Sequence, residues 1–232
     1  KAENTIGSYA CDLNLVVAPP YDIISERLQE KLYRSHPNNV IRLELNRETP
    51  QDNERENRYM RSAAYLKEWL DTGILIQEDQ PVIYIYFMDY RTSEEESKTL
   101  KGFVCRLRLE AFDAGVVLPH ENTLSGPKAD RLRLMETCHT NFSPIFSLYS
   151  NPAREIPRIL DETARSEPLI HVTDLDGVHH RIWAMTDPDA IQRIRKVLSD
   201  RPLFIADGHH RYETALTYRN NMRKKTGKHD GC

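Results

Sequence analysis

The sequence predicts an α+β fold in which helices pack on mixed and antiparallel sheets. Segments with helical and with strand periodicity follow one another along the 232 residues, without the strict alternation that a doubly wound parallel sheet requires. Hydrophobic residues make up 39% of the chain, which is enough for a buried core and argues against a disordered protein. This length allows one large domain or two small ones, and we expect a single domain over residues 1–232.

Three elements are expected in the first third of the chain. Ser25 is a typical N-cap residue, and the apolar residues that follow it at helical spacing predict a helix over 26–35. The alternation of apolar and polar residues over 39–45 predicts a strand. A second helix is expected over 53–71, because apolar side chains recur there every three or four residues and Gly73 favours a helix end.

The middle of the chain predicts a pair of antiparallel strands followed by a helix. Residues 82–88 are rich in β-branched and aromatic side chains, and residues 100–109 alternate between apolar and polar. The charged segment 91–98 between them is expected to be an exposed hairpin connection. A helix over 127–138 follows, with apolar residues at helical spacing.

The next segment alternates between helices and short strands. Helices are expected over 153–166 and 187–199, where apolar residues share one face. Strands are expected over 169–172 and 180–185, and the Asp-Gly dipeptide at 176–177 predicts a hairpin turn between them.

Charge and composition exclude several classes of protein. Lys and Arg number 32 and Asp and Glu 35, so that the net charge is −3 and no polybasic field points to nucleic acid. No apolar run reaches the roughly 18–20 residues of a membrane span. The four cysteines are scattered singly, without a CxxC pair, which is typical of a reducing cytoplasm. Because the sequence has no P-loop, Rossmann or GxSxG motif, those enzyme classes are not expected.

The most informative segment is the Asp-Gly-His-His-Arg sequence at 207–211. It lies between a short apolar strand expected over 203–206 and a helix expected over 210–225. The first turn of a helix has unpaired backbone N–H groups and the positive end of the helix dipole. This geometry binds anions, and phosphate in particular.

Each residue of this segment can contribute to such a site. Gly208 allows a backbone conformation or a close approach that other residues do not. His209, His210 and Arg211 add donors, and an arginine can pair with phosphate in a bidentate way. Asp207 is placed to bind Mg²⁺ or to orient a histidine. The alternative interpretation is structural: Asp207 caps the helix, Arg211 pairs with a nearby carboxylate, and the histidines lie on the surface.

The strand–turn–helix unit resembles the phosphate-binding motif of the ParB/sulfiredoxin superfamily. That superfamily includes ParB nucleotide-binding domains, with a Gly-Glu-Arg-Arg type of motif, sulfiredoxin, with a Gly-Cys-His-Arg type, and free-serine kinases. The serine kinases have a form similar to residues 207–211 of this chain. His209 stands where sulfiredoxin has its nucleophilic cysteine, so sulfinic-acid reduction is not expected.

A second resemblance extends over nearly the whole chain. Four motifs precede the Asp-Gly-His-His-Arg segment in order: Ala-Pro-Pro-Tyr-Asp at 18–22, His-Pro-Asn-Asn at 36–39, Pro-His-Glu-Asn-Thr at 119–123 and Ser-Pro-Ile-Phe at 143–146. Together they resemble the bacterial and archaeal family of domain of unknown function 1015. Members of that family usually extend beyond the last residue of this chain. We therefore expect the chain to be an N-terminal portion of a longer protein.

Four further residues are candidates for a phosphate-transfer site. Lys128 and Arg131 follow the 119–123 motif and are suited to contact phosphate, while Glu121 is suited to bind metal or to act as a base. Asp22 follows a stiff Pro-Pro-Tyr segment that can hold a carboxylate in place as a general base. Equally, the first group fits an ordinary surface loop and helix start, and Asp22 fits a turn residue.

These observations lead us to expect a nucleotide-dependent phosphotransferase. The turn itself implies only phosphate, whereas the superfamily resemblance implies a nucleotide, ATP or ADP, and a small hydroxylated substrate, plausibly free serine. Asp22 or Glu121 would accept the hydroxyl proton, with Mg²⁺ at Asp207. The expected partners are a small-molecule substrate and a nucleotide, and a homodimer is considered for the chain. Two alternatives remain open: a non-catalytic nucleotide-binding module and a metal-dependent phosphoesterase or nuclease.

Overall fold

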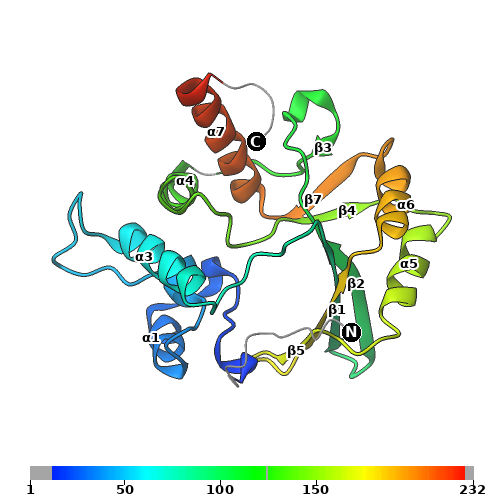
Figure 1. Cartoon of the computed structure of the whole chain (residues 1–232), viewed down its shortest axis with the longest axis horizontal. Coiled ribbons are helices and arrows are strands. Elements are labelled where there is room, and N and C mark those ends of the chain that lie inside the picture. Colours follow the sequence, from blue (N-terminus) through cyan, green and yellow to red (C-terminus); the bar gives the residue numbers. More distant parts are fainter. Residues whose placement is uncertain (1–11, 124, 228–232) are drawn as a thin grey trace. The chain divides into compact units, whose positions relative to one another are not determined.

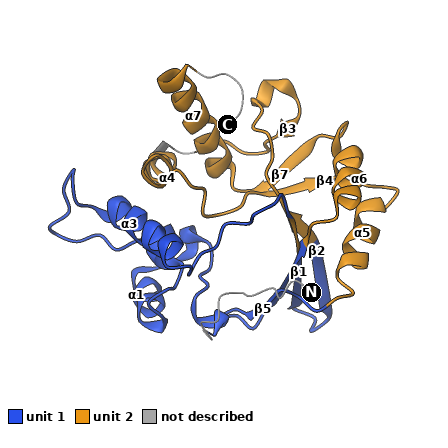
Figure 2. Cartoon of the chain, viewed as in Figure 1, with its two compact units in different colours: residues 1–82, 86–101, 167–184 blue, residues 83–85, 102–166, 185–232 orange. Residues whose placement is uncertain are grey.

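The computed structural model describes residues 12–123 and 125–227 and confirms the α+β class. The chain divides into two compact units (Figures 1 and 2). Unit 1 comprises residues 1–82, 86–101 and 167–184, and unit 2 comprises 83–85, 102–166 and 185–232. Each unit is therefore assembled from segments that are distant in the sequence.

Unit 1 combines N-terminal helices with most of a four-stranded sheet. Its helices are the short 3-10 helices η1 (Leu13–Leu15) and η2 (Tyr21–Ile23), α1 (Glu26–Ser35), α2 (Ile41–Glu44) and α3 (Arg58–Asp71). The sheet has the order β2-β1-β6-β5 and consists of β1 (Ile83–Arg91), β2 (Ser97–Val104), β5 (Ile170–Thr173) and β6 (His179–Met185). Strands β5 and β6 pair antiparallel, as the Asp-Gly turn between them predicts.

Unit 2 contains the three-stranded sheet and the C-terminal helix. Its helices are η3 (Phe112–Ala114), α4 (Ser125–Cys138), α5 (Glu155–Thr163), α6 (Pro188–Leu198) and α7 (His209–Thr226). Its strands are β3 (Val117–Leu118), β4 (Phe146–Tyr149) and β7 (Leu203–Asp207), in the order β3-β7-β4. The central strand β7 pairs parallel with β3 and antiparallel with β4, so this sheet is mixed.

The strand predicted over 39–45 is wrong, because this segment forms the short helix α2. The Asn39 side chain explains the difference: its Oδ1 accepts the backbone N–H of Ile41 at 3.0 Å, which favours a turn over an extended path. The first helical bonds then form from Glu44 N–H to Val40 and from Leu45 N–H to Ile41. Apolar positions that read as strand alternation belong to one buried helical turn.

Asn39 also fixes the segment before the Ala-Pro-Pro-Tyr-Asp motif. It is fully buried, and its Nδ2 donates to the carbonyl oxygens of Leu15 and Val17, each at 2.8 Å. Val40 N–H donates to Val16 at 2.8 Å. The 36–39 motif is therefore tied, within unit 1, to the segment that leads into the 18–22 motif.

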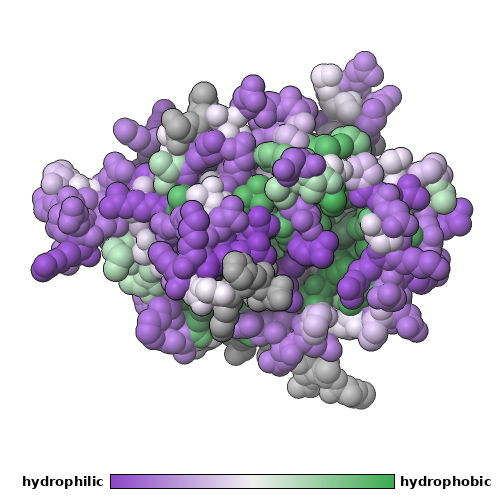
Figure 3. All heavy atoms as spheres, turned by 90° about the horizontal axis from the view of Figure 1, so that it is seen from above, coloured by the Kyte–Doolittle hydropathy of each residue, from purple (hydrophilic) through white to green (hydrophobic). Residues whose placement is uncertain are grey.

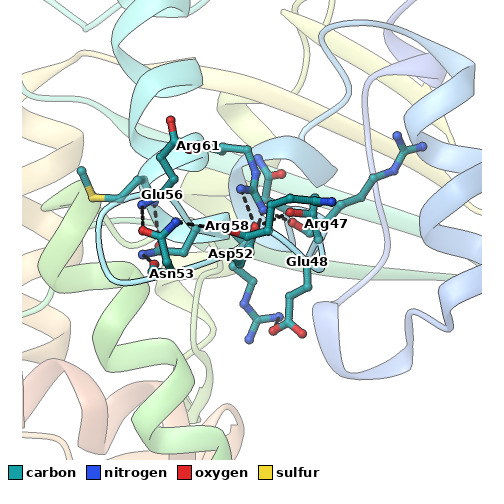
Figure 4. A network of polar contacts seen from close by, with 12 residues as sticks. Arg47, Glu48, Asp52, Asn53, Glu56, Arg58 and Arg61 are labelled. Atoms are coloured by element: carbon teal, nitrogen blue, oxygen red, sulfur yellow. Dashed lines mark hydrogen bonds and ion pairs between the residues drawn. The ribbon is translucent and has the colours of Figure 1, made fainter.

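An arginine–carboxylate network fixes the connection between α2 and α3 (Figure 4). Arg61 on α3 pairs with both oxygens of Asp52, at 2.8 and 2.9 Å, and also donates to the carbonyl oxygen of Arg47. Thr49 Oγ1 donates to Asp52 at 2.6 Å. These bonds, that from Arg61 above all, hold the pKa of the Asp52 carboxyl far below its ordinary value.

The core of unit 2 determines where β7 passes into α7. Val117 on β3, Ile205 on β7 and Tyr212 on α7 are each at most 1% exposed and pack together. The Tyr212 hydroxyl donates to the Glu110 carbonyl oxygen at 2.8 Å and accepts the Glu110 N–H at 3.0 Å. The first turns of α7 are therefore held against the sheet by both apolar contact and hydrogen bonds.

The surface agrees with the charge content of the sequence. Hydrophilic residues make up most of the face shown in Figure 3, with hydrophobic residues in patches between them. Within the described residues, no helix has the length and apolar character needed to span a membrane.

Candidate functional site

The strand–turn–helix unit expected around residues 207–211 is confirmed and lies within unit 2 (Figure 1). Strand β7 ends at Asp207, and α7 begins at His209 and continues for 18 residues. Gly208 between them has φ 93°, a left-handed conformation that side-chain-bearing residues rarely adopt. Its carbonyl oxygen accepts the N–H of Tyr212 at 2.9 Å, which closes the first helical turn. The N-terminal amides of a long helix therefore follow directly from the central strand of the three-stranded sheet.

The Arg211 side chain is folded back onto this turn. Its guanidinium pairs with the Asp207 carboxylate and donates to the carbonyl oxygen of Pro144. The side chain of Arg211 is only 12% exposed, whereas that of Asp207 is 61% exposed. Gly208 permits this approach, because a Cβ atom there would lie 3.0 Å from Cζ, Nε and Nη2 of Arg211. The guanidinium of Arg211, which was expected to bind phosphate, is therefore already paired with the Asp207 carboxylate.

His209 is a buried link between α7 and the 119–123 segment. It is 1% exposed, and its Nε2 accepts the backbone N–H of His120 at 3.3 Å, so that in the neutral ring the proton resides on Nδ1. Nδ1 lies 2.9 Å from Oε1 of Glu121. The two groups are not aligned for a hydrogen bond, and Nδ1 has no such partner among the described residues. This geometry favours a positioning role for His209 over proton transfer at Nε2.

His120 was not among the candidate residues, although the sequence placed it in the 119–123 motif. Its Nδ1 lies 2.8 Å from the carbonyl oxygen of Ile205 on β7. Its ring meets the ring of His209 edge-on, with centroids 4.5 Å apart and planes at 87°. The motif indicated that the 119–123 segment belongs to the site. The carbonyl oxygen that orients the His120 ring lies 85 residues away, so the sequence could not predict this contact.

Glu213, one turn along α7 from the Asp-Gly-His-His-Arg segment, holds the start of α4. Its Oε2 accepts from Thr123 Oγ1 at 2.8 Å and from Lys128 Nζ at 2.7 Å. Burial raises the pKa of Glu213, but the bonds from Lys128 and Thr123 outweigh it and hold the pKa below its ordinary value. The electrostatic interaction with His210 lowers the pKa of Glu213 further. Lys128, expected to contact phosphate, thus has a carboxylate partner.

Arg131 is also engaged by a carboxylate. It is 6% exposed, and its Nε donates to Oδ2 of the adjacent Asp130 at 2.7 Å. Its placement on α4 agrees with the sequence prediction, but its guanidinium lies inside the protein rather than on an open surface. This geometry favours a structural role for Arg131.

The two carboxylates proposed as bases lie in different units. Glu121 lies beside His209 in unit 2, with its side chain 54% exposed. Asp22 lies on η2 in unit 1 and is exposed, so its participation stays a prediction. Among residues 12–123 and 125–227, no group of three or more His, Cys, Asp or Glu side chains could hold a metal ion.

Three sequence motifs converge at the N-terminus of α7. The 119–123 segment reaches it through His120 and Thr123, and the 143–146 segment through the Pro144 carbonyl oxygen. The third is the Asp-Gly-His-His-Arg segment itself. Residues that are up to 90 positions apart in the sequence therefore form one polar cluster, which we call the α7 cluster.

Comparison with known proteins supports the family resemblance that these motifs suggest. No curated protein and no solved structure matches the chain. The family model described as "Protein of unknown function (DUF1015)" matches residues 7–231, which is nearly the whole sequence. The chain therefore belongs to the DUF1015 family.

Proposed function

We propose that this protein is a nucleotide-dependent phosphotransferase that acts on a small hydroxylated metabolite, with free serine as the first candidate. The observation that carries the proposal is the β7–Gly208–α7 turn, which joins the N-terminal amides of a long helix, a left-handed glycine and an arginine at one point. The resemblance of residues 207–211 to the free-serine kinases supports the nucleotide and the acceptor. The two free cysteines of the described residues, Cys105 and Cys138, fit a cytoplasmic location.

Phosphate binding in this proposal requires a local exchange of partners. The Asp207 carboxylate, which is mostly exposed, leaves Arg211, and a phosphate group takes its place between the guanidinium and the first amides of α7. Such an exchange replaces one anion by another, so the largely buried side chain of Arg211 keeps a partner throughout. Phosphoryl transfer depends mainly on positioning and charge neutralisation, which these donors supply.

Mg²⁺ fits this arrangement only as an ion shared with the nucleotide. The described residues offer no three-ligand group for a metal. Mg²⁺ typically takes one or two protein carboxylates together with substrate phosphate oxygens, and Asp207, once released from Arg211, could supply one. The ion would neutralise charge on the phosphates.

A second candidate is a non-catalytic nucleotide-binding module. It is favoured because each basic residue expected at the site already has a carboxylate partner. The pairs are Arg211–Asp207, Lys128–Glu213 and Arg131–Asp130. In this case the anion would displace Asp207 and change the conformation of the turn without any transfer.

The experiment is a screen of ATP and ADP, with Mg²⁺, against amino acids and polyols, with phosphorylated products detected by mass spectrometry. We expect a product with the wild-type chain, loss of product in Arg211→Ala and partial retention in Arg211→Lys. Arg219→Ala is a matched control, since Arg219 lies about two turns further along α7 and also donates to a backbone carbonyl. Equal product from wild type and Arg211→Ala would exclude the turn as the site. Nucleotide binding without product would favour the second candidate, and hydrolysis without an acceptor would indicate a phosphoesterase.

A further inference from the structure

We propose that His120 is the group that accepts the proton from the substrate hydroxyl; this inference rests on the proposed phosphotransferase function. A carbonyl oxygen can only accept a hydrogen bond, so the 2.8 Å contact between Nδ1 and the Ile205 carbonyl oxygen places a proton on Nδ1. In the neutral ring the lone pair therefore belongs to Nε2. The tautomer that a base requires is thus fixed by the backbone of β7.

The ring of His120 is also held in position. Its backbone N–H donates to Nε2 of His209, and the two rings meet edge-on at 4.5 Å. His209 is the first residue of α7 and is almost completely buried, so it provides a rigid support. His120 itself is exposed, so a substrate beside the helix N-terminus can approach its side chain. Orientation by a second residue is the usual arrangement for a histidine that transfers protons.

The other acceptors of the α7 cluster are already engaged. The carboxylate of Glu213 pairs with Lys128 and Thr123. That of Asp207 pairs with Arg211 and, once phosphate has displaced it in the proposed exchange, would serve Mg²⁺. Nε2 of His209 accepts from the His120 amide. Glu121 faces Nδ1 of His209, and a carboxylate is a weaker base at neutral pH than an imidazole. Among the described residues, the hydrogen-bond contact of the His120 ring engages Nδ1, so the lone pair of Nε2 is left for a substrate.

In the transfer step a proton and a phosphoryl group each change partners. The O–H bond of the acceptor breaks, and its proton passes to Nε2 of His120. The hydroxyl oxygen forms a bond to the terminal phosphorus of the nucleotide, and the bond from that phosphorus to the bridging oxygen breaks. The leaving nucleotide keeps the electron pair on that oxygen. His120 then releases its proton to solvent, so no further reactant is needed.

Two substitutions of His120 distinguish the role of the Nε2 lone pair as a base from the structural contact of Nδ1 with the Ile205 carbonyl oxygen. The amide nitrogen of asparagine is as many bonds from Cα as Nδ1 is, so His120→Asn keeps a donor for the Ile205 carbonyl while removing the base. His120→Gln removes the base and places an amide near the Nε2 position. His139→Asn is the matched control, because His139 is exposed in the same unit and its Nδ1 contacts a neighbouring side chain, Tyr218, at 2.8 Å.

We expect the transfer rate kcat to fall by about 100-fold or more in both His120 variants, which is the usual scale of general-base catalysis. The nucleotide Kd and the melting temperature of His120→Asn should stay near the wild-type values, and His139→Asn should transfer phosphate normally. Transfer that persists in both His120 variants would overturn this assignment and leave the proposed function intact. Loss of transfer in Glu121→Gln with retention in His120→Asn would assign the base to Glu121. Absence of transfer in the wild-type chain would overturn both proposals.

Discussion

The guanidinium of Arg211 lies directly against Gly208, with Cζ, Nε and Nη2 all 3.0 Å from the position that a Cβ atom would occupy. Gly208 is therefore required twice: for its left-handed backbone, with φ 93°, and for the space into which Arg211 folds. The two requirements are coupled, because the arginine can reach both Asp207 and Pro144 only across the bare glycine.

Gly208→Ala should therefore cost more than backbone strain alone. A left-handed non-glycine residue costs about 1–2 kcal/mol, and the displaced arginine would add to that cost. Gly115→Ala is the matched control, since Gly115 has φ 71° but no atom within 4 Å of its Cβ position. Urea unfolding should show a larger loss of unfolding free energy for Gly208→Ala than for Gly115→Ala. Equal losses would mean that the contact with Arg211 has no energetic weight.

Asp207→Asn should strengthen phosphate binding. The carboxylate is mostly exposed, and exposed ion pairs contribute about 0.2–1 kcal/mol, so its removal should raise the affinity for inorganic phosphate by up to about fivefold. Calorimetric titration of phosphate into the wild type and the variant measures this effect. Asp113→Asn on η3 makes the same charge change and should leave the affinity nearly unchanged. Weaker binding in Asp207→Asn would show that the carboxylate helps to hold the ligand.

Acid should weaken unit 1 through Asp52. Its pKa is lower in the folded protein than the ordinary value of 3.8, so the unfolded chain binds protons more readily as the pH falls. The stabilisation by the Asp52–Arg61 pair is then fully present above about pH 5 and is lost progressively below it. The melting temperatures of wild type and Asp52→Asn, followed from pH 7 to pH 3, should therefore converge.

The control for this pH series is a second ion pair on the same helix. Lys67 and Asp71 form an exposed i,i+4 pair on α3, and such pairs contribute little. Asp71→Asn should follow the wild type at every pH. If the gap between wild type and Asp52→Asn stayed constant down to pH 3, the low pKa of Asp52 would have no bearing on stability.

Most long elements of the fold could be predicted from the sequence. The helix over 26–35 and the hairpin around 176–177 are confirmed, because a capping residue and a turn dipeptide act locally. The segment 39–45 was misread, since the buried hydrogen bonds of Asn39 outweigh its alternating pattern. Strands β3 and β4 are two and four residues long, too short for periodicity to show. The two units interleave along the chain, so each is made of segments that are distant in the sequence.

The location of the candidate site could be predicted from the sequence, but the hydrogen-bond partners of its side chains could not. Local sequence sufficed for the strand, the glycine turn and the helix start at 207–211. The partners of its side chains come from distant segments, such as the Ile205 carbonyl for His120 and Pro144 for Arg211. A sequence shows which residues carry charge or a lone pair, but only tertiary contacts decide which of them are already occupied.

The Lys128–Glu213 ion pair either ties α4 to α7 or holds a phosphate-binding lysine in reserve, and its coupling energy distinguishes the two roles. Their side chains are 32% and 27% exposed and join α4 to α7 at 2.7 Å. A double-mutant cycle of Lys128→Ala and Glu213→Ala, measured by urea unfolding, should give a coupling energy of about 1 kcal/mol, the upper range for pairs that are not fully buried. The Arg108–Glu110 pair, in which the arginine is 86% exposed, should give a coupling near zero. If Lys128 and Glu213 were uncoupled and Glu213→Ala bound phosphate more tightly, Lys128 would be a ligand that Glu213 holds back rather than a tie between helices.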